Sequence, residues 1–132
     1  MPRLGAVSLL VRDYDEAIAF YVGKLGFDLS EDTDMGGGKR WVTVTPKGGE
    51  TSLLLARATT PEQTARIGDQ AGGRVWLFLE TDDIARDHAA WTAAGVRFRE
   101  APRREAYGMV AVFEDLYGNA WDLIEPAQGP TA

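Results

Sequence analysis

Apolar and polar residues follow the same order twice along this chain. Residues 7–27 (VSLLVRDYDEAIAFYVGKLGF) and residues 75–98 (VWLFLETDDIARDHAAWTAAGVRF) each begin with alternating apolar positions, continue through acidic residues into a helical pattern, and pass a glycine into a further strand. A repeated pattern of this kind indicates an internal duplication. We therefore expect two similar halves, which meet side by side in a concave sheet with a ligand between them.

The first half predicts a strand, a helix and three further strands. Asp13 and Glu16 form a capping-box signature at the helix start, and Gly26 ends the helix. The run of acidic residues and glycines at 32–38 predicts a flexible loop. The predicted strands are residues 5–11, 27–31, 40–45 and 51–56, of which the last two form a hairpin.

The second half repeats this order after a linker. Residues 57–73 have the composition of a linker with a helical turn after Pro61, and Asp82 or Asp83 caps a second helix that ends before Gly95. An Arg-rich loop is expected over 102–108. The predicted strands are residues 75–80, 96–100, 109–114 and 120–125, and the last two form a hairpin around Gly118-Asn119.

These elements predict an α+β protein in which two βαβββ repeats form one mixed, strongly curved sheet with the helices on its outer face. We expect a single domain over residues 1–132, with repeat one at about 5–57, a linker at about 58–73, repeat two at about 74–125 and a disordered tail at 126–132.

Composition narrows the functional classes. The chain has 132 residues, no cysteine and a formal net charge of −6. An acidic chain repels phosphate backbones, so we expect no nucleic-acid partner. The sequence has no apolar run of membrane-spanning length and no signal-peptide pattern, so we expect a cytoplasmic protein without a membrane partner.

Two segments resemble a known superfamily. The sequences VRDYDEAIAFYVGKLGF at 11–27 and FEDLYGNAWDLIEP at 113–126 are similar to the vicinal oxygen chelate superfamily, also called the glyoxalase/bleomycin resistance protein/dioxygenase family. The resemblance covers residues 5–125. It implies the paired βαβββ fold, whereas the function stays open because one fold hosts many chemistries.

The same resemblance locates four positions at which the metalloenzymes of this superfamily hold a divalent ion. In this chain they are Ala6, Leu54, Trp76 and Asp122, and only Asp122 offers a metal-binding atom. One carboxylate is too few for a transition metal. We therefore predict no metal and no other cofactor. The only histidine, His88, shares a helical face with Ile84 and Trp91, which favours packing or surface exposure.

Strand alternation predicts which side chains face away from the helices. The candidate ligand-binding residues are Trp41, Leu54, Trp76, Phe78, Tyr107 and Asp122. Their apolar and aromatic character is typical of a small-molecule pocket. The alternative is that Trp76 and Phe78 merely fill the space of a metal. Burial among apolar residues would raise the pKa of Asp122, which could then act as a general base or bind a ligand cation.

Two functional interpretations follow from these residues. The first is a metal-independent small-molecule-binding protein resembling the bleomycin-resistance type, which holds an aromatic or cationic compound in an aromatic cleft. The second is a glyoxalase-like lyase or isomerase that uses Asp122 or Glu80 as a catalytic base, or an unrecognised metal. Because proteins of this superfamily usually complete their cavities by pairing halves, we also expect a homodimer.

Overall fold

The computed structural model describes residues 1–127, which fold as two compact units with a boundary between Gln70 and Ala71. The boundary lies inside the predicted linker. The α+β class and the two βαβββ-like modules are confirmed, but the strands pair in two separate mixed sheets, one in each unit, rather than in one sheet. Residues 128–132 of the expected tail lie outside the described residues.

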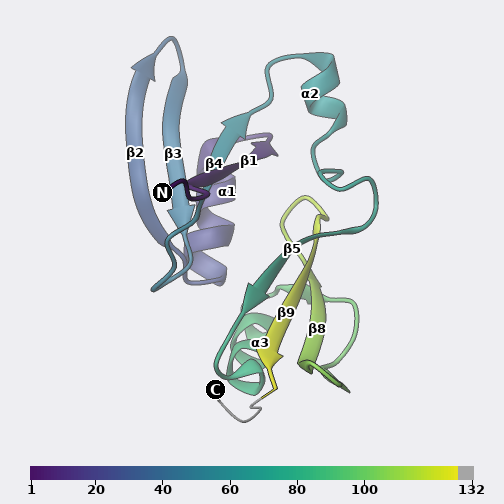
Figure 1. Ribbon diagram of the computed structural model, residues 1–132. Helices are drawn as coiled ribbons and strands as arrows, with labels where there is room; N and C mark the ends of the chain where they lie inside the picture. The colour runs from purple at the N-terminus through teal and green to yellow at the C-terminus, as the bar shows by residue number, and fades with distance from the viewer. Residues whose placement is uncertain (128–132) are drawn as a thin grey trace. The chain divides into compact units, whose positions relative to one another are not determined.

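The first unit contains a four-stranded sheet in the order β1-β4-β3-β2 (Figure 1). β1 and β4 are parallel, and the other neighbours are antiparallel. Alternate residues on one face, such as Leu9, Val42 and Leu55, are almost fully buried. The elements of this unit are β1 (Ala6–Val11), α1 (Tyr14–Ile18), η1 (Ala19–Lys24), β2 (Asp28–Gly36), β3 (Lys39–Thr45), β4 (Ser52–Arg57) and α2 (Pro61–Ala65).

The first helical segment begins where the capping pattern predicts. The Asp13 carboxylate accepts a hydrogen bond from the Glu16 backbone N–H at 2.8 Å, and the Glu16 carboxylate in turn binds Arg12. After Ile18 the helix continues with π-type bonding as η1, and it ends before Gly26, whose φ of 76° suits only glycine without strain. The segment buries Ala17, Phe20 and Tyr21 in the core of the unit.

The predicted loop at 32–38 is wrong for most of its length. β2 continues to Gly36 and pairs with β3, with Asp32 opposite Val42 and Asp34 opposite Arg40. Gly37 and Gly38 both have positive φ and form the tight turn between the two strands. The glycines thus do not loosen the backbone but allow the hairpin to close.

The second unit contains a five-stranded sheet in the order β5-β9-β8-β6, with β7 also paired to β8. Its core is aromatic: Phe113 stacks on Trp121 with ring centres 5.7 Å apart and contacts Trp91 edge-on at 5.3 Å. His88 packs edge-on against Phe98 at 4.5 Å, which agrees with its expected packing role. The elements are β5 (Val75–Glu80), α3 (Ile84–Ala93), β6 (Arg97–Phe98), β7 (Arg103–Glu105), β8 (Gly108–Glu114) and β9 (Ala120–Pro126).

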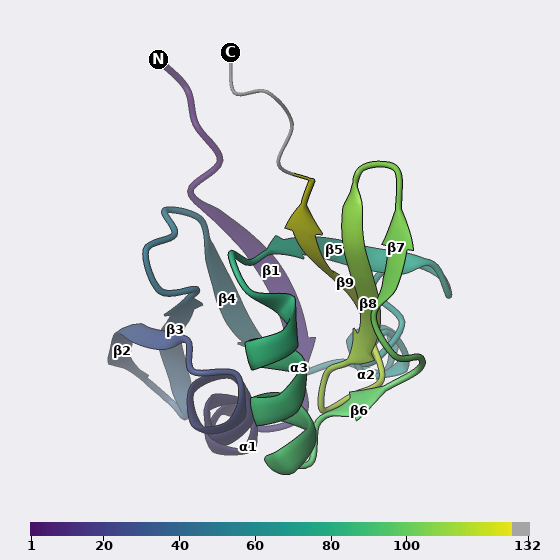
Figure 2. The same cartoon turned by 90° about the horizontal axis from the view of Figure 1, so that it is seen from below.

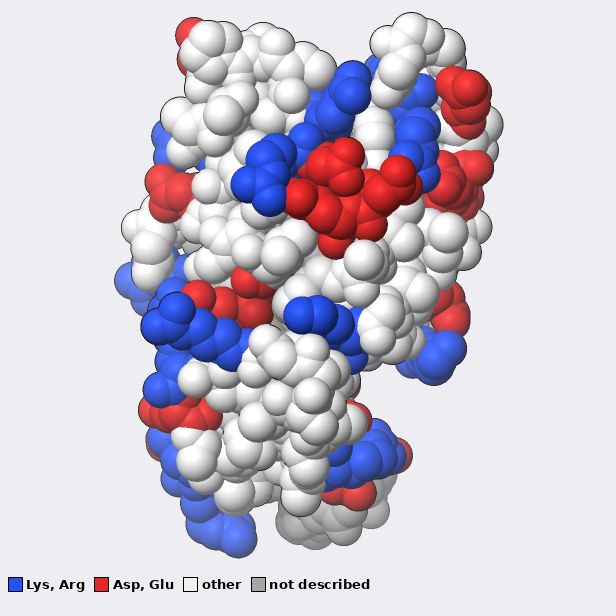
Figure 3. All heavy atoms as spheres, turned by 180° about the vertical axis from the view of Figure 1, so that it is seen from behind, with Lys and Arg blue, Asp and Glu red and all other residues white. Residues whose placement is uncertain are grey.

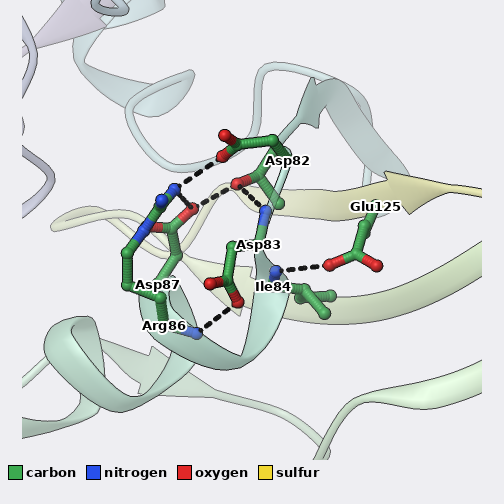
Figure 4. Close-up of polar contacts among 7 residues, drawn as sticks. Asp82, Asp83, Ile84, Arg86, Asp87 and Glu125 are labelled. Atoms are coloured by element: carbon green, nitrogen blue, oxygen red, sulfur yellow. Dashed lines mark hydrogen bonds and ion pairs between the residues drawn. The ribbon is translucent and has the colours of Figure 1, made fainter.

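The start of α3 is anchored by side chains from two elements (Figure 4). Asp83 is the N-cap and accepts from the Arg86 backbone N–H at 3.0 Å. Glu125 on β9 accepts from the Ile84 backbone N–H at 2.9 Å. Arg86 bridges Asp82 and Asp87 at 2.8 and 3.1 Å. The acidic residues at this position are therefore used to start the helix and to hold it against the sheet.

Two predicted elements of the second half differ in the structure. The strand expected at 96–100 is reduced to β6, and the Arg-rich segment expected as a loop contains β7, which pairs with β8 in a hairpin (Figure 2). The pairing sets Arg103 opposite Val110 and Glu105 opposite Gly108. Charged residues give little strand signal, but β7 gains backbone hydrogen bonds from the longer β8.

The turn between β8 and β9 is closed by a buried polar pair. Asp115 accepts hydrogen bonds from the Asn119 side-chain amide and from the Tyr117 and Asn119 backbone N–H groups, each at 2.9 Å. Both side chains are buried. The acidic-turn-Gly-Asn motif therefore has a structural role here. In residues 1–127, no helix is long and apolar enough to cross a membrane.

Candidate functional site

The open face of the first sheet carries the residues that strand alternation predicts. Leu54 lies opposite Ser8 on β1 and opposite Thr43 on β3, and Leu10 lies opposite Ala56. On β3, Val42 is buried whereas Trp41 is 40% exposed. The alternation thus places Trp41 and Leu54 on the face opposite to the core.

A pocket of about 400 Å³ adjoins this face and also reaches the buried residues Tyr14 and Leu55. Leu10, Leu54 and Ala56 provide an apolar surface, and Trp41 contributes an indole ring. A cavity of this size accommodates a small organic molecule. Leu55 and Gly37 also line the pocket, and the polar or charged side chains of the lining are Tyr14, Lys39, Arg40, Arg57, Thr59 and Gln63.

Tyr14 lies close to two guanidinium groups at the pocket. The guanidinium carbons of Arg40 and Arg57 are 5.1 and 5.6 Å from the centre of its ring, within the range of cation–π attraction. The Tyr14 hydroxyl accepts a hydrogen bond from the Arg40 backbone N–H at 3.1 Å. Because Tyr14 is buried at the start of α1, it links the helix to β3 and to the end of β4.

Arg40 is neutralised by two carboxylates. Its guanidinium donates to Asp32 at 2.8 and 3.1 Å and to Asp15 at 2.9 Å. The hydrogen bond from Arg40 lowers the pKa of Asp32, and the bonds to Asp32 and Asp15 raise the pKa of Arg40. Arg40 therefore stays protonated, and its charge is already paired.

A strip of hydroxyl groups lies along the same sheet. The Ser30 hydroxyl bonds the hydroxyls of Thr43 and Thr45 at 2.7 and 2.8 Å, and Thr45 bonds the Ser52 hydroxyl at 2.7 Å. Ser30 occupies the irregular position in the β2–β3 pairing between Leu29 and Glu31, which brings its side chain to β3. The side-chain hydroxyl groups of these strand residues thus serve as hydrogen-bond partners for one another.

In the second unit, Asp122 lies opposite Phe78 on β5 and Val112 on β8. Burial raises the pKa of Asp122, and the positive charge of Arg103 opposes this shift. The prediction of a raised pKa is therefore confirmed in direction. Phe78 is 64% exposed, so this face offers an aromatic ring beside a carboxylate.

Trp76 lies at an irregularity in the pairing of β5 with β9. The β5–β9 register shifts between Val75 and Leu77, and Trp76 packs edge-on against the core residue Trp121 with ring centres 5.5 Å apart. The structure therefore pairs Asp122 with Phe78 rather than with Trp76. Glu80 is exposed opposite Ile124, and Tyr107 is exposed after β7, where its carbonyl accepts from the Ala127 N–H at 2.8 Å.

Sequence and structure comparisons agree with this architecture. A model of the Glyoxalase/Bleomycin resistance protein/Dioxygenase superfamily matches residues 3–123. The chain belongs to this superfamily. An uncharacterized protein of Shewanella frigidimarina (strain NCIMB 400) is 58% identical over 121 residues, which are 90% of each chain.

Two solved structures are also similar to this chain. The crystal structure of UcmS2 has a TM-score of 0.82 and 30% identity, over 95% of this chain and 98% of that one. The structure of TnmS3, an antibiotic binding protein from Streptomyces sp. CB03234, has a TM-score of 0.78 and 34% identity, over 96% and 98% of the two chains.

The residues of this chain at the four expected metal-ligand positions do not fit a metal site. Ala6 and Leu54 carry no donor atom, and Trp76 lies against Trp121. Within residues 1–127, no three His, Asp or Glu side chains are placed to share an ion. Asp122 alone cannot complete a coordination shell, so no chemistry is assigned to a metal here.

Sequence reasoning missed the cations of the pocket. Arg57 falls at the start of the predicted linker, and Lys39 and Arg40 follow the glycines of the predicted loop, so they were not candidates. One signal was available, because Arg57 directly follows the apolar strand TSLLLA and ends β4. Tyr14 follows the helix cap and gives no local sign of contact with residues 40 and 57.

Proposed function

We propose that this protein is a metal-independent small-molecule-binding protein that holds an aromatic compound in the pocket of its first unit. The observation that carries the proposal is the pocket of about 400 Å³, in which Leu10, Leu54 and Ala56 lie beside the indole of Trp41. Removal of an aromatic ring from water against such a surface contributes roughly 25 cal/mol for each Å² buried. Apolar contact therefore favours binding by a route that requires no metal.

One similar solved structure supports binding rather than turnover. TnmS3 is described as an antibiotic binding protein, and it is 34% identical to this chain over nearly the full length of both. By this similarity, we propose that the ligand is an antibiotic-like aromatic compound and that the protein sequesters it unchanged, as in the bleomycin-resistance type.

The sequence allowed an aromatic or a cationic ligand, and the pocket favours the aromatic alternative. Its lining includes three cationic side chains and no carboxylate. In the second unit, a cationic ligand at Asp122 would compete with the charge of Arg103. The role of Asp122 in binding a cation remains a prediction.

An enzymatic function has one observation in its favour, the raised pKa of Asp122. A carboxylate of raised pKa can act as a general base in a lyase or isomerase. Mass spectrometry of a bound compound after prolonged incubation separates the two functions. A binding protein returns the compound unchanged, whereas a product that disappears in Asp122→Asn would support the enzyme.

A thermal-shift screen of aromatic compounds, with and without added divalent ions, tests the proposal. We expect a compound that raises the melting temperature equally with chelator and with metal. Leu54→Glu, which places a charge in the apolar part of the pocket, should abolish the shift. Phe78→Ala, in the second unit, is the matched control and should retain it. A shift that requires a metal, or that survives Leu54→Glu, would contradict the proposal.

A further inference from the structure

Arg57 is a cation held at the pocket without a carboxylate partner. Its guanidinium lies against the Tyr14 ring at 5.6 Å and beside Gly38, where an added Cβ would be 3.4 Å from Arg57 Nη2. Throughout residues 1–127, no Asp or Glu forms an ion pair with Arg57 or with Lys39, which lines the same pocket. Ring and glycine therefore position the Arg57 charge and leave its hydrogen-bond donors available.

Several other cations of the first unit are in ion pairs, whereas Lys24 lies over the Phe20 ring and does not line the pocket. Arg12 binds Glu16, Lys47 binds Asp28, and Arg66 binds Asp69, at 2.8, 2.7 and 3.5 Å. Seen from behind, Lys and Arg atoms lie next to Asp and Glu atoms at several places on the surface (Figure 3). Arg57 and Lys39 place two cations without an ion pair in the lining of one pocket. Their positions favour a ligand that supplies the missing negative charge.

We propose that the pocket takes an aromatic ligand that carries a carboxylate or a similar anionic group, with the anion at Arg57 and Lys39 and the ring against Leu54. The inference rests on the proposed function, because it names the ligand class of the same pocket. Guanidinium matches a carboxylate with two parallel hydrogen bonds, and charge-assisted bonds of this kind are stronger than neutral ones.

One carboxylate sets the direction of the ligand. Glu31 accepts a hydrogen bond from the Trp41 indole N–H at 3.3 Å, so negative charge already lies at the nitrogen edge of this ring. Asp15 and Asp32 are bound to Arg40. An anionic group is repelled by Glu31 and attracted by Arg57, so the ligand is oriented with its anion toward the end of β4.

Calorimetric titration of the full chain at low ionic strength tests this inference with two matched probes, 2-naphthoate and its uncharged amide, 2-naphthamide. We expect the wild type to bind naphthoate about fivefold to tenfold more tightly than naphthamide. The ratio should fall toward one in Arg57→Gln and be largely kept in Arg57→Lys. Lys24→Gln removes a positive charge that does not line the pocket, and it should leave the ratio unchanged.

The outcomes separate the two proposals. Equal affinities of the wild type for naphthoate and naphthamide would overturn the anion inference and leave aromatic binding in place. Binding of neither probe would count against the proposed pocket itself. If Arg57→Gln weakened both probes equally while its melting temperature stayed at the wild-type value, Arg57 would act through packing, and the anion inference would again be overturned.

Discussion

The guanidinium carbon of Arg57, at the end of β4, lies 5.6 Å from the centre of the Tyr14 ring at the start of α1. This contact joins two elements that are far apart in the sequence. It also fixes the position of one charged side chain that lines the pocket. The same ring receives Arg40 from β3, and its hydroxyl accepts the Arg40 backbone N–H. Tyr14 thus has two separable roles, one of the ring and one of the hydroxyl.

Tyr14→Phe removes only the hydroxyl acceptor. We expect the free energy of unfolding to fall by about 1 kcal/mol, because the Arg40 N–H loses its partner, while the affinity for an aromatic probe is kept. Tyr14→Leu also removes the cation–π surface and should weaken binding. Urea unfolding and calorimetric titration measure the two effects. Equal stability of wild type and Tyr14→Phe would show that the hydroxyl contact is unimportant.

Asp122 should give a distinct pH dependence. Because burial raises its pKa in the folded state, Asp122 favours the folded state below its usual pKa of 3.8, and this contribution is lost as pH rises through the raised value. As pH rises through the raised pKa of Asp122, we expect the Asp122→Asn variant to gain stability relative to the wild type. Urea unfolding at a series of pH values measures this difference.

Asp32→Asn is a control of opposite sign for this experiment. The hydrogen bond from Arg40 lowers the pKa of Asp32, so its stabilising contribution is present above the usual pKa of 3.8 and is lost as pH falls through the lowered value. This variant should lose stability relative to the wild type as pH rises from the acid range. If the stability of both variants relative to the wild type changed in the same direction with pH, the opposite pKa shifts assigned to Asp122 and Asp32 would be contradicted.

Gly108 is required by a close approach of two backbones. An added Cβ would lie 2.1 Å from the Glu125 carbonyl oxygen, and φ is 144°. Gly48 also has positive φ, 75°, but nothing lies within 4 Å of its Cβ position. We expect Gly48→Ala to cost about 1 kcal/mol of unfolding free energy and Gly108→Ala clearly more. If denaturant titrations gave similar losses of unfolding free energy for the two variants, the close approach of β9 to Gly108 would not be what requires glycine there.

Much of the fold could be predicted from the sequence because apolar alternation and helix caps are local signals. Val7, Leu9 and Val11 revealed β1 and its buried face, and Asp13 marked the start of α1. The extension of β2 beyond residue 31 and the short β7 were missed because polar and charged residues predominate in both segments. Their strand conformation comes from pairing with β3 and β8, which no local pattern shows.

The candidate site was predicted in part for the same reason. Alternation correctly placed Trp41 and Leu54 on one face, since each lies within a regular ladder. It could not anticipate the shift in register between Val75 and Leu77 or the contact of Trp76 with Trp121. It also could not reveal Arg57, because the contact with Tyr14 joins residues from different elements.

We predict that the protein is a homodimer. Phe78, on the second sheet, is 64% exposed, and Trp41, on the first, is 40% exposed, which leaves large apolar side chains for a second copy to cover. Light scattering at micromolar concentration should give about twice the mass of one chain. The mass of a single chain would contradict this prediction.

Nuclear magnetic resonance mapping of a bound aromatic probe tests the central claim most directly. With 2-naphthoate added to isotopically labelled protein, we predict that the largest shifts occur at the methyl groups of Leu10, Leu54 and Ala56 and at the Trp41 indole N–H. These groups belong to the proposed pocket. Shifts confined to other residues, or no shifts at saturating probe, would contradict binding in the pocket of the first unit.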